Sequence, residues 1–318
     1  MCQYFSCKFV VFVSKNMQTE FDLEEIKDIV RLAIKEDIGT GDITSRIFIP
    51  EGSESEGVLI AKEAGIVAGL PVAGYVLSQI DKDLIFKANI EDGSRVEKGS
   101  VIASVKGLTL SLLSAERLVL NFLQRLSGIA TATNRFAERV KGYKTQILDT
   151  RKTTPGWRYL EKYAVKIGGG ANHRMGLYDQ ILIKDNHLEV MEPGKENGNI
   201  GSLVKKAREQ VANEVLIEVE VEDLCQIKEM VDAGVDIILF DNMAPSKIGE
   251  AVEIVKELEN SRDAGTSGAI LTEASGNITI ENVEEYAKVG VGRISVGMIT
   301  HSARALDISF DISYKVVL

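Results

Sequence analysis

The chain has 318 residues, of which 45% are hydrophobic and 26% charged, as is typical of globular proteins. Its formal net charge of -10 argues against a general nucleic-acid binder, because such proteins usually carry a basic surface. Three cysteines are too few for a disulfide framework, and no apolar run is long enough to cross a membrane. We expect a cytoplasmic protein of one large or two ordinary domains, without nucleic-acid or membrane partners.

The first part of the chain predicts a small α/β unit. Residues 22–37 have apolar side chains at helical spacing, and residues 58–105 have the pattern of short strands separated by glycine and charged turns. Residues 111–139 predict a long helix that Gly128 breaks or bends. Residues 91–107 are similar to half of a biotinyl- or lipoyl-type β-sandwich, but they lack the Met-Lys-Met or Asp-Lys-Ala of a carrier domain. A structural role for this segment is therefore favoured over a carrier protein.

Strand-like and helical segments alternate from residue 145 onwards. The helical patterns lie between six apolar runs, at 146–149, 180–184, 215–221, 236–241, 268–273 and 293–297. This alternation predicts βα units around a parallel sheet, and hence an α/β fold. Six or more units favour a β/α barrel over a short open sheet. The final stretch, residues 305–317, alternates again and is expected to pair with the first unit.

Charged and polar side chains gather where these predicted strands end. They are Asp149, Arg151, Lys152, Lys184, Asp185, Asn186, His187, Glu218, Glu220, Asp241, Asn242, Glu273 and, after Gly297, His301. The carboxyl ends of barrel strands form one mouth, and the active sites of this fold lie there. A polar residue at one strand end can arise by chance, whereas polar residues at most of the strand ends predict a site.

Basic residues are concentrated between positions 151 and 184, where the chain is net positive although the whole protein is acidic. The basic residues of this segment are Arg151, Lys152, Arg158, Lys162, Lys166, Arg174 and Lys184. Guanidinium groups bind carboxylates and phosphates through paired hydrogen bonds, and ammonium groups act as point charges. Arg158, Lys162 and Lys166 have the spacing of one helix face, so we expect these three to be solvated. The other four lie beside strand ends or glycine turns and are expected to bind an anion.

The carboxylates of the predicted mouth are suited to a hard cation. Glu218 and Glu220 alternate on one strand and so share a face, and Asp241 ends the next strand. Oxygen ligands of this kind suit Mg²⁺, which usually arrives with substrate phosphates. Salt bridges to the nearby cations are an alternative that does not exclude the metal.

Histidines and glycine turns lie beside the charged segments. His173 is the strongest candidate for contact with a substrate anion, whereas His187 either contacts a ligand or satisfies backbone groups at the strand end. Residues 168–170 predict either a close approach of the backbone or a nest of N–H groups. The turns at 275–277 and at Gly297 follow the last two strands, where barrels commonly bind phosphate. The glycine motifs of dinucleotide-binding and P-loop proteins are absent from the sequence.

Several longer motifs resemble one known family. They are SAERLVLNFLQRLSGIAT, DTRKTTPGWRYLEKYAVKIGGGANHRMGLYDQILIKDNH, EVEVE, LFDNM, LTEASGNI and SVGMITHSARALDISFDI. Over about residues 22–312 the chain resembles nicotinate-nucleotide pyrophosphorylase (carboxylating), also called quinolinate phosphoribosyltransferase. The resemblance implies an α/β sandwich domain followed by an incomplete, about seven-stranded β/α barrel. It also implies a homodimer or higher even oligomer with shared active sites.

The resemblance implies an activity and a division of the chain. Members of that family transfer the phosphoribosyl group of phosphoribosyl pyrophosphate to quinolinate with decarboxylation, giving nicotinate mononucleotide, pyrophosphate and CO₂ for NAD biosynthesis. By position, residues 17–127 together with 303–318 are expected to form the sandwich domain, and 128–302 the barrel. Residues 1–16 are expected to be an N-terminal extension.

Roles for single residues also follow from the resemblance. Arg117 is expected to reach into the active site of the partner subunit. The residues expected to contact quinolinate and the phosphoribosyl donor are Arg151, Lys152, His173, Arg174 and Lys184. Mg²⁺ and the ribose are expected to be held by Glu220 and Asp241, which together with Lys152 are the catalytic candidates. The residues expected to contact phosphate are Ser275, Gly276, Asn277, Gly297 and His301.

The sequence departs from the family pattern at one position. Asn277 stands where the family often has the second of two glycines, and asparagine tolerates a left-handed backbone better than most residues. We therefore expect the loop to keep its shape. A related pyrophosphorylase linked to molybdate transport shares much of the central motif, so another aromatic acid is the alternative substrate.

Overall fold

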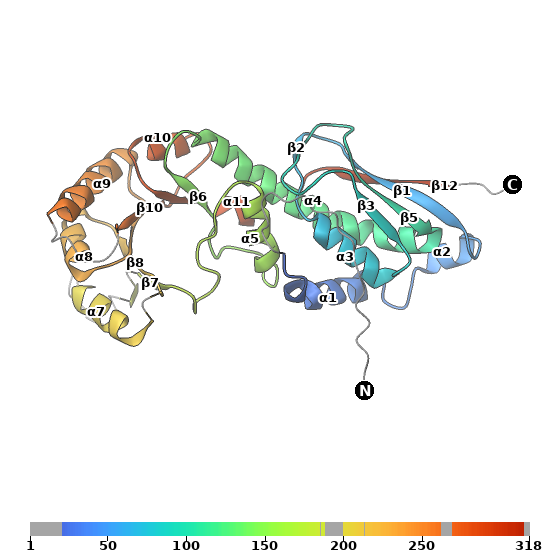
Figure 1. Cartoon of the computed structure of the whole chain (residues 1–318), viewed down its shortest axis with the longest axis horizontal. Coiled ribbons are helices and arrows are strands. Elements are labelled where there is room, and N and C mark those ends of the chain that lie inside the picture. Colours follow the sequence, from blue (N-terminus) through green and yellow to red (C-terminus); the bar gives the residue numbers. More distant parts are fainter. Residues whose placement is uncertain (1–20, 185, 188–199, 213, 262–268, 315–318) are drawn as a thin grey trace.

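The computed structural model describes residues 21–184, 186–187, 200–212, 214–261 and 269–314. The extension predicted at residues 1–16 lies outside them. Figure 1 shows two parts, with a curved parallel sheet at one end, an antiparallel sheet at the other and the long helix α4 (Thr109–Arg139) running between them. No helix among the described residues is long and apolar enough to span a membrane.

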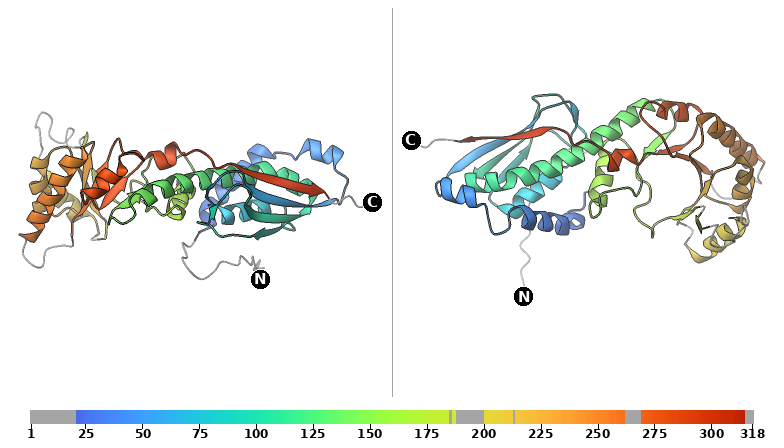
Figure 2. Two further views of the ribbon diagram at one scale, coloured as in Figure 1. Left: turned by 90° about the horizontal axis from the view of Figure 1, so that it is seen from above. Right: turned by 180° about the vertical axis from the view of Figure 1, so that it is seen from behind.

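The first part is built on an antiparallel sheet in the order β12-β1-β5-β3. Its strands are β1 (Glu54–Ala61), β3 (Ile85–Ala88), β5 (Val101–Leu108) and β12 (Ile308–Tyr314). Helix α4 packs against this sheet, and β12 returns from the far end of the chain to pair along β1 (Figure 2). The smaller elements of this part are η1 (Glu24–Ile26), α1 (Lys27–Asp37), α2 (Ile43–Phe48), β2 (Gly65–Ile66) and β4 (Arg95–Val96).

Residues 70–80 form a helix, so the prediction of strands throughout 58–105 is wrong there. Helix α3 (Leu70–Ile80) begins after Gly69, which has a left-handed φ of 105°. The carboxylate of Asp92 accepts hydrogen bonds from the amides of Gly69 and Leu70, at 2.7 and 3.0 Å. Six of the eleven helical residues are buried, and the helix therefore lacks the polar face that would reveal its period in the sequence.

Helix α4 is continuous, so of the break or bend predicted at Gly128 the break does not occur. A Cβ at this position would lie 2.1 Å from the carbonyl oxygen of Arg304, because the segment that leaves the barrel crosses α4 here. Gln124 holds the same segment, since its Nε2 donates to the oxygen of Ile308 at 2.7 Å. Gly128 is therefore required by packing. The predicted boundary between the two domains, at 127/128, falls within this one helix.

The second part is a six-stranded parallel sheet in the order β6-β11-β10-β9-β8-β7. Its strands are β6 (Gln146–Leu148), β7 (Ile181–Ile183), β8 (Ile217–Val221), β9 (Ile237–Asp241), β10 (Leu271–Ser275) and β11 (Arg293–Ser295). The accompanying helices are α5 (Arg158–Ile167), α7 (Ile200–Gln210), η2 (Leu224–Gln226), α8 (Ile227–Ala233), α9 (Pro245–Asn260), α10 (Val283–Lys288) and α11 (Met298–His301). Figure 1 shows α7, α8, α9 and α10 on the outer side of the strands.

The sheet is an incomplete barrel, as predicted. A parallel bridge joins Leu148 of β6 to Ala171, and this bridge marks a seventh strand position. Within the described residues no ladder joins Ala171 to β7, so the barrel is open on that side. Glu273 of β10 lies opposite both Arg293 of β11 and Leu239 of β9. Residues in register point to the same side of a sheet, so strand pairing aligns charged side chains on one face of these strands.

Gly128→Ala should lower the free energy of unfolding by about 2 kcal/mol, because the new methyl group would overlap the Arg304 carbonyl and force α4 and the crossing segment apart. Urea unfolding followed by circular dichroism measures the change. Gly249→Ala in α9 is the matched control, since its Cβ would make only ordinary contacts at 3.4 Å with Val289. Helix propensity predicts that this control is neutral or up to about 1 kcal/mol more stable. Equal effects of the two variants would contradict the packing role of Gly128.

Candidate functional site

Two guanidinium groups lie close together at the carboxyl ends of the strands. Burial and the neighbouring Arg151 lower the pKa of Arg174. Nη1 of Arg174 donates to the oxygen of Gln180 at 3.2 Å. Nε of Arg151 is buried and has no hydrogen-bond partner among the described residues. A buried donor without an acceptor costs free energy, and two neighbouring cations repel, so an anion bound here would relieve both.

Lys152 and His301 meet beside Gly297. A Cβ at Gly297 would lie 3.1 Å from Cδ of Lys152 and 3.3 Å from Nε2 of His301. Oγ1 of Thr300 donates to the backbone oxygen of Lys152 at 2.9 Å. The segment that follows β6 is thus held against the turn that follows β11, its neighbour in the sheet. This arrangement places an ammonium group and an imidazole at one glycine turn, where the sequence predicts phosphate binding.

The turns after β9 and β10 are joined to each other. Gly276 has a φ of 90°, and a Cβ there would lie 2.1 Å from Oδ1 of Asn242. Asn277 has a φ of 53°, which confirms the left-handed backbone expected at this position, and its Nδ2 donates to Oδ1 of Asn242 at 3.1 Å. Asn242 in turn donates to Asp241 at 2.6 Å. The glycine turn is therefore fixed relative to the carboxylate that ends β9, and Ser275 lies opposite that carboxylate in the sheet.

Glu220 and Asp241 stand near the ends of neighbouring strands, β8 and β9. Nζ of Lys184, which follows β7, forms an ion pair with Glu220, so the salt bridge considered from the sequence is present. Asp241 is partly exposed. Mg²⁺ commonly binds one or two carboxylates together with substrate phosphates and water. Two carboxylates beside a phosphate-type turn fit that pattern.

A buried charged cluster lies deeper along the same strands. Nε2 of His173 lies 3.1 Å from an oxygen of Glu218 and 3.4 Å from one of Glu273, and Nε of Arg293 lies 3.0 Å from Glu273. Both glutamates are completely buried. Burial and the charge of Glu218 raise the pKa of Glu273 to about 7. Burial lowers the pKa of His173, but Glu218 and Glu273 outweigh it and raise that pKa overall.

His173, Glu218 and Glu273 have ligand atoms within 4.8 Å of one another, as a metal site would require. Nδ1 of His173, however, accepts a hydrogen bond from the amide of Arg174 at 2.7 Å, so its neutral ring carries the proton on Nε2. A protonated ring nitrogen cannot bind a metal. The geometry therefore favours a cluster in which Nε2 of His173 contacts Glu218 and Glu273, and Arg293 forms an ion pair with Glu273. The substrate contact of His173 stays a prediction.

The face of α5 predicted to be solvated is partly buried. Lys162 is only 3% exposed, and its Nζ forms an ion pair with the buried carboxylate of Asp149. Arg158 donates to the backbone oxygen of Arg151 at 3.4 Å and is half-buried. Of the three residues only Lys166 is exposed. The prediction is wrong for Lys162 because a buried carboxylate at the end of β6 requires a cationic partner.

The glycines at 168–170 do not form an anion nest. Their amides donate within the end of α5, to the oxygens of Ala164, Lys166 and Val165. A Cβ at Gly168 would lie 2.4 Å from the oxygen of Ala130. The alternative of a close backbone approach, here between α5 and α4, is the one observed.

Three of the predicted residues differ from the others: one satisfies a backbone group, one lies far from the strand ends and one lies outside the described residues. His187 accepts a hydrogen bond from the amide of Lys184 at 2.9 Å, so it satisfies the backbone at the end of β7. Arg117 is exposed on the half of α4 that carries the antiparallel sheet, and its side chain lies 3.9 Å from Glu116. Asp185 lies outside the described residues.

The sequence did not reveal the residues that lie beneath the mouth and bind the segments that form it. Glu161 is completely buried and accepts hydrogen bonds from Thr154 and Arg125. Thr300 and Arg293 have similar supporting positions. The opposite charges of Glu273 and Arg293 on neighbouring parallel strands could have suggested their pairing. Nothing in the sequence links Arg125 to Glu161.

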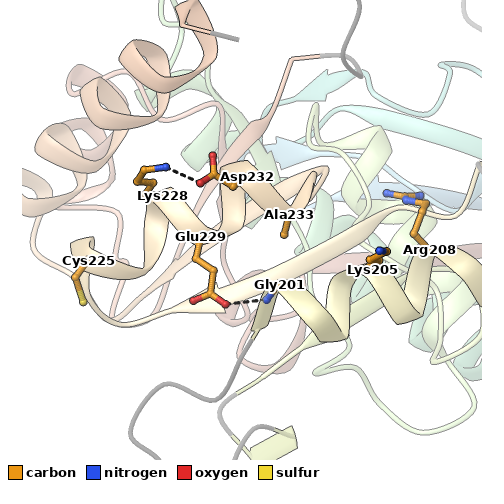
Figure 3. A pocket seen from close by; sticks show the side chains of 8 residues that line it. All are labelled: Gly201, Lys205, Arg208, Cys225, Lys228, Glu229, Asp232 and Ala233. Carbon is orange, nitrogen blue, oxygen red and sulfur yellow. Dashed lines mark hydrogen bonds and ion pairs between the residues drawn. The ribbon is translucent and has the colours of Figure 1, made fainter. Parts of the chain in front are cut away.

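A hollow of about 710 Å³ lies on the outside of the barrel, between α7 and α8 (Figure 3). Its charged groups are largely satisfied within the chain. Lys228 pairs with Asp232 at 2.6 Å, and Glu229 accepts a hydrogen bond from the amide of Gly201 at 2.9 Å. None of the predicted site residues lines this hollow, so the mouth of the barrel is the candidate site.

Two family models cover most of the chain. The C-terminal domain of quinolinate phosphoribosyl transferase matches residues 129–311, and the N-terminal domain of the same family matches residues 42–127. The chain belongs to the quinolinate phosphoribosyltransferase family. A relative from Bacillus subtilis, named probable nicotinate-nucleotide pyrophosphorylase (carboxylating), is 43% identical over 91% of this chain and 94% of its own length.

Other relatives extend the family across kingdoms. Quinolinate phosphoribosyltransferase (decarboxylating) 1b from Nicotiana tabacum is 40% identical over 92% of this chain and 84% of its own length. The crystal structure of NadC from Streptococcus pyogenes superposes with a TM-score of 0.85 at 35% identity, and covers 94% of this chain and 100% of that one. The nicotinate-nucleotide pyrophosphorylase from Francisella tularensis gives a TM-score of 0.81 at 37% identity, over 91% and 96% of the two chains.

The charged cluster predicts how stability depends on pH. The pKa of Glu273 is raised from 4.5 to about 7, so the folded state binds this proton more tightly than the unfolded chain. The stabilisation is complete below about pH 4.5 and is lost as the pH rises through 7. Through this group the free energy of unfolding of wild type should fall by about 3 kcal/mol as the pH rises from below 4.5 to above 7. Glutamine cannot ionise, so Glu273→Gln should not show this fall. Urea unfolding at a series of pH values measures this difference.

The control for this experiment is Glu36→Gln, which changes an exposed glutamate on α1. Its stability should follow the wild-type pH profile. If the profile of Glu273→Gln also runs parallel to wild type, the buried carboxyl does not bind the extra proton.

Proposed function

We propose that this chain transfers the phosphoribosyl group of phosphoribosyl pyrophosphate to quinolinate and releases pyrophosphate and CO₂. The product is nicotinate mononucleotide, a precursor in NAD biosynthesis. The observation that carries the proposal is the pair of neighbouring guanidinium groups, Arg151 with its unpartnered buried Nε and Arg174. The acceptor of the proposed reaction, quinolinate, is a dicarboxylate, and the donor carries several phosphates. Both substrates are anionic, which explains a cationic mouth in a chain of net charge -10.

The two substrates occupy different parts of the mouth. Arg151 and Arg174 bind the carboxylates of quinolinate, since guanidinium groups match carboxylates with paired hydrogen bonds. Lys152, Gly297 and His301 receive phosphate groups, together with the turn at 275–277. Lys152 lies between the two parts, because it follows Arg151 in the chain and contacts Gly297 in space. It is therefore placed to neutralise negative charge on either substrate.

The reaction places positive charge where the chain supplies carboxylates. As the pyrophosphate leaves, positive charge develops at C1 of the ribose, and Glu220 and Asp241 stabilise it electrostatically. The ring nitrogen of quinolinate attacks C1 and becomes a pyridinium. The C–C bond to the adjacent 2-carboxylate then breaks, its electron pair flows towards the positive ring nitrogen, CO₂ leaves, and a proton is taken up at C2. The chain's contribution is orientation, exclusion of water and charge stabilisation.

Mg²⁺ is part of the proposal. Glu220 and Asp241 would hold it, and it would neutralise the charge of the leaving pyrophosphate. Nζ of Lys184 forms an ion pair with Glu220 beside these two carboxylates.

A coupled assay with quinolinate, phosphoribosyl pyrophosphate and Mg²⁺ tests the reaction directly by following CO₂ and nicotinate mononucleotide. Arg151→Ala and Arg174→Ala should each raise the KM for quinolinate by about tenfold or more and lower kcat, because a carboxylate loses its paired donors. Circular dichroism should show that both variants fold. Arg208→Ala, outside the mouth on α7, is the control and should keep wild-type kinetics.

Near-normal kinetics in both arginine variants would overturn the assignment. A substrate panel of nicotinate, quinolinate and other pyridine acids identifies the acceptor. Product from a different acid, with none from quinolinate, would point to the alternative aromatic-acid substrate.

The proposal includes a homodimer or higher even oligomer with shared sites. Arg117 is exposed on α4, and α2 exposes the apolar side chains of Ile43, Ile47 and Phe48, by 72, 68 and 74%. A surface of this kind is commonly covered by another chain. A cytoplasmic location, inferred from the few cysteines, also belongs to the proposal.

Mixing Arg117→Ala with Lys152→Ala should restore activity that neither variant has alone. In a mixed dimer one site receives an intact Arg117 from one subunit and an intact Lys152 from the other. With random exchange of subunits, about a quarter of the wild-type activity is expected. Activity measured after co-refolding checks this, with each variant refolded alone as the control. No recovery in verified mixed dimers would exclude a site completed by Arg117 of the partner.

A further inference from the structure

The mouth depends on a segment without regular structure between β6 and α5, and this segment carries Arg151 and Lys152. Its far end is held by Glu161, the buried carboxylate of α5. Glu161 Oε1 accepts from the hydroxyl of Thr154 at 2.8 Å, and its Oε2 accepts from the amide of Thr154 at 3.2 Å. One side chain therefore fixes both the backbone and the side chain of a residue two positions after Lys152.

Arg125 of α4 connects this carboxylate to the other side of the mouth. Its Nη2 and Nε donate to Glu161 at 2.7 and 3.2 Å. Nη2 also donates to the backbone oxygen of Thr300 at 2.6 Å, and Nη1 donates to that of Ala303 at 2.9 Å. A planar guanidinium with several fixed donors can hold three elements in one geometry. Here it joins α4, α5 and the end of α11.

Thr300 connects the two sides of the mouth through its hydroxyl. Its hydroxyl lies 2.9 Å from the oxygen of Lys152 and 3.0 Å from that of Gly297. The side chain is completely buried. The same residue thus contacts the segment that carries Lys152 and the glycine turn beside His301. Arg125, Glu161 and Thr300 form what we call the bracing network.

We propose that the bracing network sets the spacing between the carboxylate-binding part and the phosphate-binding part of the mouth. This inference rests on the proposed function, in which the two parts hold the two substrates. The three residues are positioning residues, because they touch Lys152, Thr154 and Gly297 and not the reacting atoms. A transfer between two bound substrates depends steeply on their separation and alignment, so a small shift lowers the rate of the bound complex.

The network is tested by two variants that change little in shape. Thr300→Val removes the hydroxyl that contacts Lys152 and Gly297, and Glu161→Gln removes the charge that faces Arg125 and replaces one accepting oxygen by a donor. Both should lower kcat by about tenfold, while the KM of each substrate changes by less than about threefold. Each part of the mouth stays intact, and only the alignment between the parts is lost. Thr300→Ser keeps the hydroxyl and should retain near-wild-type kcat.

Thr145→Val is the matched control. The hydroxyl of Thr145 is also buried and donates to a backbone oxygen, that of Val291 at 2.7 Å, but at the end of β6 away from the mouth. This variant should lose thermal stability comparable to Thr300→Val and keep wild-type kinetics. A wild-type kcat for both Thr300→Val and Glu161→Gln would overturn the inference. So would an equal loss in Thr145→Val, or a loss confined to one KM.

Hydrogen exchange separates this inference from the proposed function. The amides of residues 150–157 should exchange faster in Thr300→Val than in wild type or Thr145→Val, because the segment has lost its anchor. Unchanged exchange there would overturn the inference, whatever the activity. An inactive wild-type protein would refute the proposed function, and faster exchange in Thr300→Val would still establish the bracing of this segment.

Discussion

The parallel alignment of the barrel strands is the constraint on which the rest of the structure depends. Since all six strands run in one direction, their carboxyl ends meet at one edge, and whatever follows each strand is brought together. Lys152, Lys184, Asp241 and His301 come from distant parts of the sequence, yet all lie at or just beyond such ends. The same register aligns Glu273 with Arg293 deeper along the strands.

Charge balance explains how an acidic chain holds a cationic mouth. The cations of the mouth are not an isolated patch, because buried carboxylates lie behind them. Asp149 pairs with Lys162, and Glu161 pairs with Arg125. Glu218 and Glu273 are offset by Arg293 and by the proton that the cluster holds near neutral pH. Pairs of this kind add little to stability, but removing one partner leaves a buried charge, so they hold the surrounding segments in place.

Much of the fold and the site could be predicted from the sequence. The alternation of apolar runs with helical patterns predicts the barrel, and polar residues at strand ends predict its mouth. Errors arose where burial conceals the pattern. Helix α3 is apolar on most sides, and Gly128 has the residue type of a helix break although its real role is close packing. Lys162 has the spacing of a solvated face, but a buried carboxylate faces it.

The sequence by itself determined the family, the order of the elements and most residues of the mouth, because periodicity and strand-end chemistry are local properties of the chain. Only the tertiary structure decided which partners these residues have. The contacts of Arg125 with Glu161, and of Thr300 with Lys152, join segments 36 and 148 residues apart. No local pattern records such a pairing, since it depends on how α4, α5 and α11 pack together.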